Sequence, residues 1–147
     1  MGWVVQRHGE LYAREFGWDQ RFEGLVAGVV AQFVANFDAQ RERCWIAERG
    51  GRRLGSVFLV KKSPRVAQLR MLIVEPAARG LGIGERLVTE CVAEARRLGY
   101  RKIVLWTQAN LKSARRIYRA LGFRLVKREP HASFGRRLVG EYWELAL

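Results

Sequence analysis

The residues best suited to chemistry lie in one short segment, Arg79 to Gly84, which reads R-G-L-G-I-G. It follows an apolar run from Leu69 to Val74 that predicts a buried strand, and it precedes a stretch, 85–98, with helical periodicity. Glycines at alternate positions leave the backbone bare, so successive N–H groups can turn toward one anion at the positive end of the helix. The segment therefore predicts a site for a phosphorylated cofactor.

Two common phosphate-binding patterns do not fit this segment. A P-loop requires Lys and then Ser or Thr after its last glycine, whereas Glu85 and Arg86 follow Gly84. A dinucleotide fingerprint requires G-x-G-x-x-G and an acidic residue about 20 residues on. The spacing here is G-x-G-x-G, and the strand expected over 100–107 ends without an acid. What remains is R-x-x-G-x-G, with a tight glycine turn that binds nothing as the alternative.

The remaining pattern resembles the pyrophosphate loop of the GNAT acetyltransferases, which bind acetyl-CoA. A second segment, two elements later, resembles another signature of this family. It is carried by Asn110, Ala114, Tyr118, Gly122 and Phe123. The resemblance implies an α/β fold with a mixed, mostly antiparallel sheet of about seven strands and about four flanking helices. The length of 147 residues fits one N-acetyltransferase domain over 1–147.

The resemblance also implies a reaction, the direct attack of a primary amine on the thioester of acetyl-CoA. Backbone N–H groups near the end of the strand before the glycine loop would polarise the acetyl carbonyl. The residues implied for cofactor binding are Leu72, Ile73, Val74, Arg79, Gly80, Leu81, Gly82, Ile83, Gly84 and Asn110. An ordinary apolar strand would show the same letters at positions 72–74.

Tyr118 matches the general acid of the family. A phenol with a pKa of about 10 can protonate a thiolate of pKa about 8.5 only in direct contact. The alternative is a core aromatic residue, because Tyr118 falls on the apolar face of its predicted helix.

The acceptor side is less defined. Glu23 and His131 are candidates for the base that keeps the amine neutral, and either could instead be a surface residue. Trp18 is a candidate for the wall of the substrate pocket. The substrate favoured by the sequence is a small amine with a carboxylate, which Arg70 or a neighbouring arginine could pair in a bidentate way.

The formal net charge is +13, and it is uneven. Residues 1–60 hold 8 basic and 7 acidic side chains, whereas residues 61–147 hold 19 basic and 7 acidic ones. A positive field around the two motifs would help to capture the anionic cofactor. A solvated arginine-rich surface and non-specific nucleic-acid binding are the alternatives.

Other features limit the class of protein. No apolar run reaches the roughly 18 residues of a membrane-spanning helix, and no signal peptide is recognisable near the N-terminus. The two cysteines, Cys44 and Cys91, are expected in the core, and no spacing suggests a metal site. These features predict a cytoplasmic protein without a metal.

The expected elements begin with a short strand at Trp3–Gln6 and a helix near Leu11–Phe16. Asp19 is expected to cap the second helix and Asn110 the last one, and a loop is expected over 129–137. Both ends of the chain also resemble GNAT modules that are fused behind MarR-type winged-helix domains, for which 147 residues leave no room.

Together these observations predict an acetyl-CoA-dependent N-acetyltransferase that acts on a small-molecule amine, with homodimerisation left open. The alternative is a basic module that binds nucleic acid or a partner protein and retains acyl-CoA binding without turnover.

Overall fold

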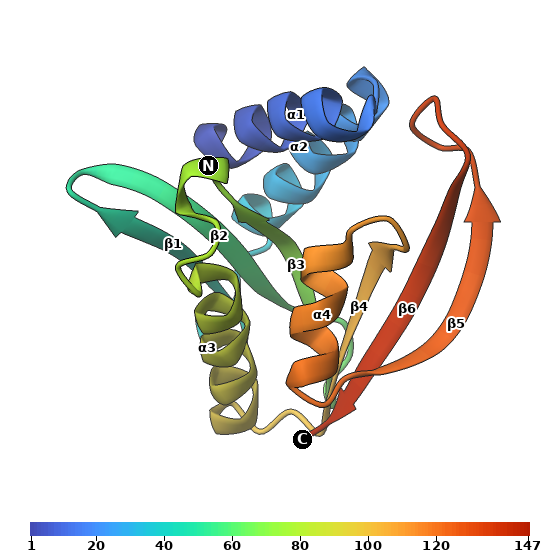
Figure 1. Ribbon diagram of the computed structural model, residues 1–147. Coiled ribbons are helices and arrows are strands. Elements are labelled where there is room, and N and C mark those ends of the chain that lie inside the picture. Colours follow the sequence, from blue (N-terminus) through green and yellow to red (C-terminus); the bar gives the residue numbers. More distant parts are fainter.

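The computed structural model describes residues 1–147 as four helices and six strands (Figure 1). The helices are α1 Gly2–Phe16, α2 Gln20–Ala35, α3 Ile83–Arg97 and α4 Lys112–Ala120, with a short 3₁₀ helix at Pro76–Ala78. The strands are β1 Arg43–Arg49, β2 Arg52–Lys61, β3 Val66–Val74, β4 Lys102–Gln108, β5 Arg124–His131 and β6 Leu138–Ala146.

The strands form one sheet in the order β1-β2-β3-β4-β6-β5, in which only the β3–β4 pair is parallel. That pair is short: β3 and β4 are paired only where Val66–Gln68 lies beside Lys102–Val104. Farther along, β4 stays paired with β6 as far as Gln108, whereas β3 is paired only with β2. The sheet therefore opens between β3 and β4 near its centre. The predicted fold class, a mixed and mostly antiparallel sheet with flanking helices, is confirmed.

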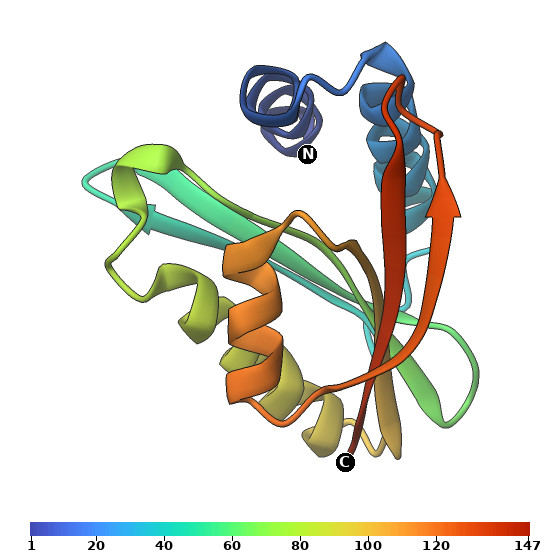
Figure 2. The same cartoon turned by 45° about the vertical axis from the view of Figure 1, so that its right-hand side comes forward.

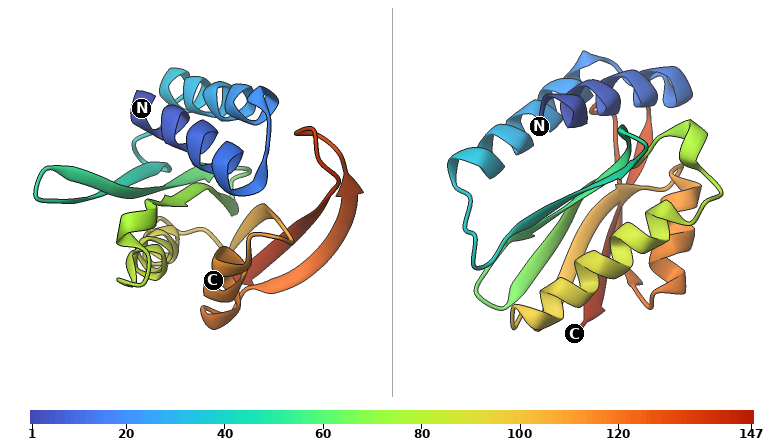
Figure 3. Two further views of the ribbon diagram at one scale, coloured as in Figure 1. Left: turned by 45° about the horizontal axis from the view of Figure 1, so that its top comes forward. Right: turned by 90° about the vertical axis from the view of Figure 1, so that its left-hand side faces the viewer.

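Helices cover both faces of the sheet (Figures 2 and 3). On one face, α1 and α2 enclose a core that includes Val26, Phe33 and the β2 residue Phe58. On the other face, α3 and α4 pack over a larger core that includes Cys91 and Trp143. Burial of these apolar side chains holds the helices to the sheet, and the opening between β3 and β4 lies between the two layers.

Most helix boundaries follow local signals. Asp19 begins α2 as predicted, because its carboxylate accepts the Arg21 backbone N–H at 3.0 Å. Helices α3 and α4 end just before Gly99 and Gly122, whose φ angles of +86° and +93° suit glycine at a helix C-terminus.

The strand predicted at Trp3–Gln6 is wrong, because these residues form the first turns of α1. Val4, His8 and Leu11 are the buried residues of this helix. Their spacing of four and then three residues places them on one helical face. A run of three apolar residues, Trp3 to Val5, fits a strand or a helix equally well, and the deciding positions lie beyond it. The sheet consequently has six strands and not seven.

Two smaller expectations are also wrong. The N-cap of α4 is Leu111, and no side chain caps this helix, so Asn110 lies exposed in the preceding turn. The loop expected over 129–137 is shorter, because β5 continues to His131 and Pro130 pairs with Val139. Proline is tolerated there because β5 is an edge strand of the sheet.

Candidate functional site

The three glycines of the loop have two different roles. Gly80 and Gly82 have φ angles of +83° and +75°, which L side chains rarely adopt, and a Cβ on either would meet nothing within 4 Å. A Cβ on Gly84 would lie 2.9 Å from Ile117 Cδ1 and 3.3 Å from Val74 Cγ2. Gly84 therefore lets α3 pack closely against its neighbours, whereas Gly80 and Gly82 keep the backbone open at the N-terminus of α3.

This loop borders a cleft of about 520 Å³ between the end of β3, α1 and α4, which we call the glycine-loop cleft. Nine of the ten residues predicted for cofactor binding line it, and the tenth, Leu81, is 59% exposed outside it. The nine are Leu72, Ile73, Val74, Arg79, Gly80, Gly82, Ile83, Gly84 and Asn110.

The glycine-loop cleft is lined by more positive than negative side chains. Lys112 and Arg116 contribute positive charge from α4, and neither forms an ion pair. The Arg79 guanidinium lies 2.6 Å from the Glu15 carboxylate of α1, so its charge is already paired. An incoming anion would therefore meet unpaired charge on α4, while Arg79 would have to exchange its partner.

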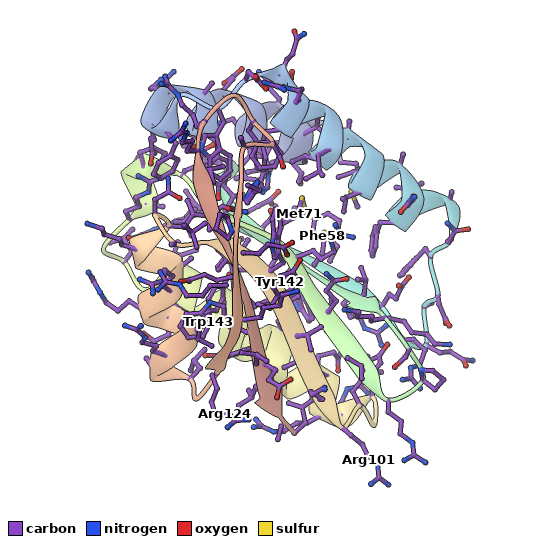
Figure 4. The ribbon with its side chains drawn as sticks, turned by 90° about the vertical axis from the view of Figure 1, so that its right-hand side faces the viewer. Phe58, Met71, Arg101, Arg124, Tyr142 and Trp143 are labelled. Atoms are coloured by element: carbon purple, nitrogen blue, oxygen red, sulfur yellow. The ribbon has the colours of Figure 1, made fainter.

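The sheet backbone is irregular beside this cleft. Met71 has a φ angle of +54°, the only positive value outside glycine. The β2–β3 register shifts at the same place, between Ser56 and Phe58, and the Ser56 hydroxyl donates to the Met71 carbonyl at 3.1 Å. The Met71 side chain lies beside Phe58 on the face toward α1 and α2 (Figure 4). This bulge lies where β3 has left β4, one residue before Leu72.

A second cleft of about 250 Å³ lies on the α1–α2 side of the same opening, and we call it the aromatic cleft. Its walls combine aromatic residues of α1, α2, β4, α4 and the loops α1–α2 and β5–β6 with polar residues of α1, β3 and β4. The aromatic residues are Tyr12, Trp18, Phe22, Trp106, Tyr118 and Phe134, and the polar ones are His8, Gln68, Arg70, Thr107 and Gln108. No Asp or Glu is among its lining residues.

Tyr118 projects from α4 into the aromatic cleft and is 4% exposed. Its ring packs near Phe123 and Trp143, and its hydroxyl forms no hydrogen bond with the protein. Burial raises the pKa of this phenol well above its usual value, so it stays protonated at neutral pH.

The three candidate substrate residues lie in different places. Trp18 is 4% exposed and lines the aromatic cleft. His131 does not line it, but its Nε2 lies 2.6 Å from the Oε1 atom of Gln108, which does. Glu23 is exposed on α2 and lies against Gly9 of α1, outside both clefts.

Polar donors are directed at the aromatic cleft from its β3 and β4 sides. Arg70 is partly buried and has no carboxylate partner, and its burial lowers the pKa of its guanidinium. His131 engages the amide oxygen of Gln108, which leaves the amide NH₂ of Gln108 without a protein partner. The cleft therefore offers unpaired hydrogen-bond donors and no carboxylate.

Sequence reasoning missed three residues of this region: His8, Tyr12 and Met71. His8 is 2% exposed, and its Nδ1–H donates to the Val4 carbonyl at 2.7 Å, so its unprotonated Nε2 is buried without a partner. Burial lowers the pKa of His8 to about 4. The spacing of His8 and Tyr12 at i and i+4 would have indicated a shared helical face, had α1 been recognised as a helix from its start.

The structure contains neither a candidate metal site nor a candidate membrane-spanning helix. No group of three or more His, Cys, Asp or Glu side chains is placed so that it could hold a metal ion. None of the helices combines the length and the apolar character that crossing a membrane would require.

Comparisons with known proteins agree with this geometry. A model of the acetyltransferase (GNAT) family matches residues 6–123. An uncharacterised N-acetyltransferase of Schizosaccharomyces pombe is 30% identical over 118 residues, which cover 79% of this chain and 72% of that protein. N-acetyltransferase family 8 member 2 of Rattus norvegicus is 36% identical over 101 residues, 65% of this chain and 44% of that protein.

Solved structures share the fold. A ribosomal-protein-alanine N-acetyltransferase from Brucella melitensis superposes with a TM-score of 0.78 at 18% identity, over 99% of this chain and 93% of that one. YncA of Salmonella typhimurium, an acetyltransferase solved with acetyl-CoA, has a TM-score of 0.69 at 22% identity, over 88% and 78% of the two chains. With the family model matched over most of its length, the chain belongs to the GNAT acetyltransferase family.

Proposed function

We propose that this protein transfers the acetyl group of acetyl-CoA to the primary amine of a small substrate that carries a carboxylate. The observation that carries the proposal is the meeting of two clefts beside the bulge in β3, one bordered by the glycine loop and one by aromatic residues. One cleft would hold the acetyl donor and the other the amine, so that the reacting atoms meet where the clefts join.

The glycine-loop cleft suits the donor. The open backbone at Gly80 and Gly82, at the N-terminus of α3, would receive the diphosphate. Lys112 and Arg116 would add attraction for its negative charges. The edge of β3 that faces away from β2 has no partner strand from Leu69 to Val74. Backbone N–H groups at 72–74 would polarise the acetyl carbonyl from there.

Tyr118 would protonate the sulfur that departs as the amine nitrogen attacks the carbonyl carbon. Its partnerless hydroxyl in the aromatic cleft supports this role. For the amine side, His131 reaches the aromatic cleft only through Gln108, so we assign it the positioning of that amide. Glu23 lies outside both clefts and gains no support as the base.

The charge of the aromatic cleft favours an anionic group on the substrate. Arg70 and the free amide NH₂ of Gln108 are donors without partners, and no carboxylate lines the cleft to attract a polyamine. A carboxylate on the substrate would pair with Arg70, most favourably in a bidentate geometry. The 250 Å³ of the cleft fits a small molecule.

The likeness of both chain ends to modules fused to MarR-type domains stays a prediction.

A competitive turnover assay would test this proposal, with release of free CoA as the readout. Zwitterionic amino acids, neutral amines, polyamines and a lysine-rich protein would be supplied at matched amine concentration. We expect preference for carboxylate-bearing amines, and we expect Arg70→Gln to lower kcat/KM by about 10-fold or more for these alone. A clear preference for the lysine-rich protein would refute a small substrate, and no CoA release with any amine would favour a binding module without turnover.

A further inference from the structure

Few polar side chains lie at the junction of the two clefts. Four residues line both the glycine-loop cleft and the aromatic cleft, namely Tyr12, Leu72, Leu111 and Ala114. Of their side chains, only that of Tyr12 can form a hydrogen bond. Tyr118 lines the aromatic cleft alone. The one side-chain donor at the junction therefore comes from α1, the helix that the sequence motifs do not include.

The ring of Tyr12 is held in place by other aromatic rings. It stacks on Trp18, with ring centroids 5.0 Å apart and planes 12° from parallel, and it meets Phe22 edge-to-face at 4.8 Å. Phe16 stacks at 5.7 Å. A ring packed among three others has little freedom to move, so its hydroxyl is fixed in position before any ligand binds.

The hydroxyl of Tyr12 is available to a ligand. It forms no hydrogen bond with the protein, and it is not among the partnerless polar atoms that are sealed from solvent. Burial raises the pKa of Tyr12 to about 12, so the group carries its proton throughout the neutral range. It is thus a permanent donor on a residue that lines both clefts.

We propose that Tyr12 is a further catalytic residue, whose phenol donates a hydrogen bond to the thioester carbonyl oxygen of acetyl-CoA at the junction of the clefts. This inference rests on the proposed function. When the neutral amine nitrogen bonds to the carbonyl carbon, the C=O π electrons move onto oxygen, and a fixed donor there stabilises the new negative charge. These electrons return to carbon as the C–S bond breaks, and the proton that the nitrogen loses to solvent balances the proton that Tyr118 gives to sulfur and regains from solvent. Tyr12 keeps its proton during this step and returns to its starting state when the C–S bond breaks. Its role is therefore separate from proton donation to sulfur by Tyr118.

Infrared spectroscopy of bound acetyl-CoA tests the inference without an amine and without turnover. The probe is acetyl-CoA with the acetyl carbonyl carbon as ¹³C or ¹²C, so that the isotope difference spectrum isolates the thioester carbonyl band. We expect this band at lower frequency in the wild-type complex than in free acetyl-CoA, and closer to the free position in Tyr12→Phe. Tyr118→Phe and Tyr142→Phe should keep the wild-type band, because Tyr142 lines neither cleft and is 39% exposed on β6 (Figure 4).

Activity then provides a second measurement. Tyr12→Phe keeps the stacked ring and should lower kcat by about 10²-fold with the best amine of the panel, with little change in acetyl-CoA affinity or melting temperature. Tyr142→Phe should match the wild type. A bound-state carbonyl band equal in the wild type and in Tyr12→Phe overturns the inference even when turnover falls. Failure of the wild type to bind acetyl-CoA, measured by calorimetry, overturns the proposed function as well.

Discussion

The glycine-loop cleft and the aromatic cleft share four residues but are assembled in different ways. The first takes most of its wall from two short segments, the end of β3 with the loop and start of α3, and the start of α4. The second collects side chains from six separate parts of the chain, α1, α2, β3, β4, α4 and the β5–β6 loop, and from the short segments before α2 and α4. The first cleft uses bare backbone, which glycine spacing reveals in a sequence. The second uses side chains of common types, which become informative only when the chain brings them together.

The largest effect is expected at the glycine loop. Gly82→Val would force a branched side chain into a φ of +75° and place it in the open space beside the backbone. We expect it to abolish the rise in melting temperature that saturating acetyl-CoA gives the wild type. Gly84→Val is the matched variant. Its Cβ would collide with Ile117 and Val74, so it should lower the melting temperature without ligand. An unchanged ligand response in Gly82→Val would show that this cleft does not depend on open backbone.

The next largest effect is expected at Tyr118, which belongs to a family motif but lines the aromatic cleft. Tyr118→Phe keeps the ring that packs near Phe123 and Trp143 and removes only a hydroxyl without a protein partner. We expect kcat to fall by about 10²-fold while acetyl-CoA affinity, measured by calorimetry, changes little. Pre-steady-state measurement of CoA formation would separate chemistry from product release. An unchanged chemical step would make Tyr118 a packing residue.

A smaller effect is expected from His8, a residue of the aromatic cleft, on the pH dependence of the protein's free energy of unfolding. The pKa of His8 is about 4 in the folded protein and about 6.5 when unfolded, so the unfolded state binds more protons between these values. The stability that depends on neutral His8 is complete above pH 6.5 and is lost as the pH falls toward 4. The free energy of unfolding should decrease by about 2 kcal/mol between pH 6.5 and 4.5 from this group alone.

Urea unfolding across that interval measures the effect of His8. His8→Gln should remove most of the pH dependence, whereas His131→Gln should retain it, because the second histidine lies in the β5–β6 region outside the buried face of α1. Glu10, Asp19 and Glu94 have pKa values lowered by their arginine or glutamine partners, so their contribution is lost below this interval. Equal pH dependence in the wild type and in His8→Gln would contradict the buried, neutral imidazole.

The elements that the sequence predicted well are those in which several local signals agree. The strand predicted from the apolar run Leu69–Val74 ends where β3 ends, at Val74, because Pro76 follows two residues later. Helix α2 has the capping Asp19 and a buried stripe that includes Val26 and Phe33. The prediction for the start of α1 was wrong because no second local signal supports the short apolar run in Trp3–Gln6. That failure also removed His8 and Tyr12 from consideration.

The mixed order of the sheet was implied by the family resemblance. Local signals in the sequence determined the strand before the glycine loop, the loop itself and the placement of Tyr118 on a helix. These features depend on side-chain period and on residues without a Cβ, which are written along the chain. The tertiary structure alone decided the bulge at Met71, the pairing of Arg79 with Glu15, and the position of Tyr12 where two clefts meet. A positive φ at a methionine has no sequence signal, and contacts between residues more than 60 positions apart arise only when the separate faces of α1 and the sheet pack together.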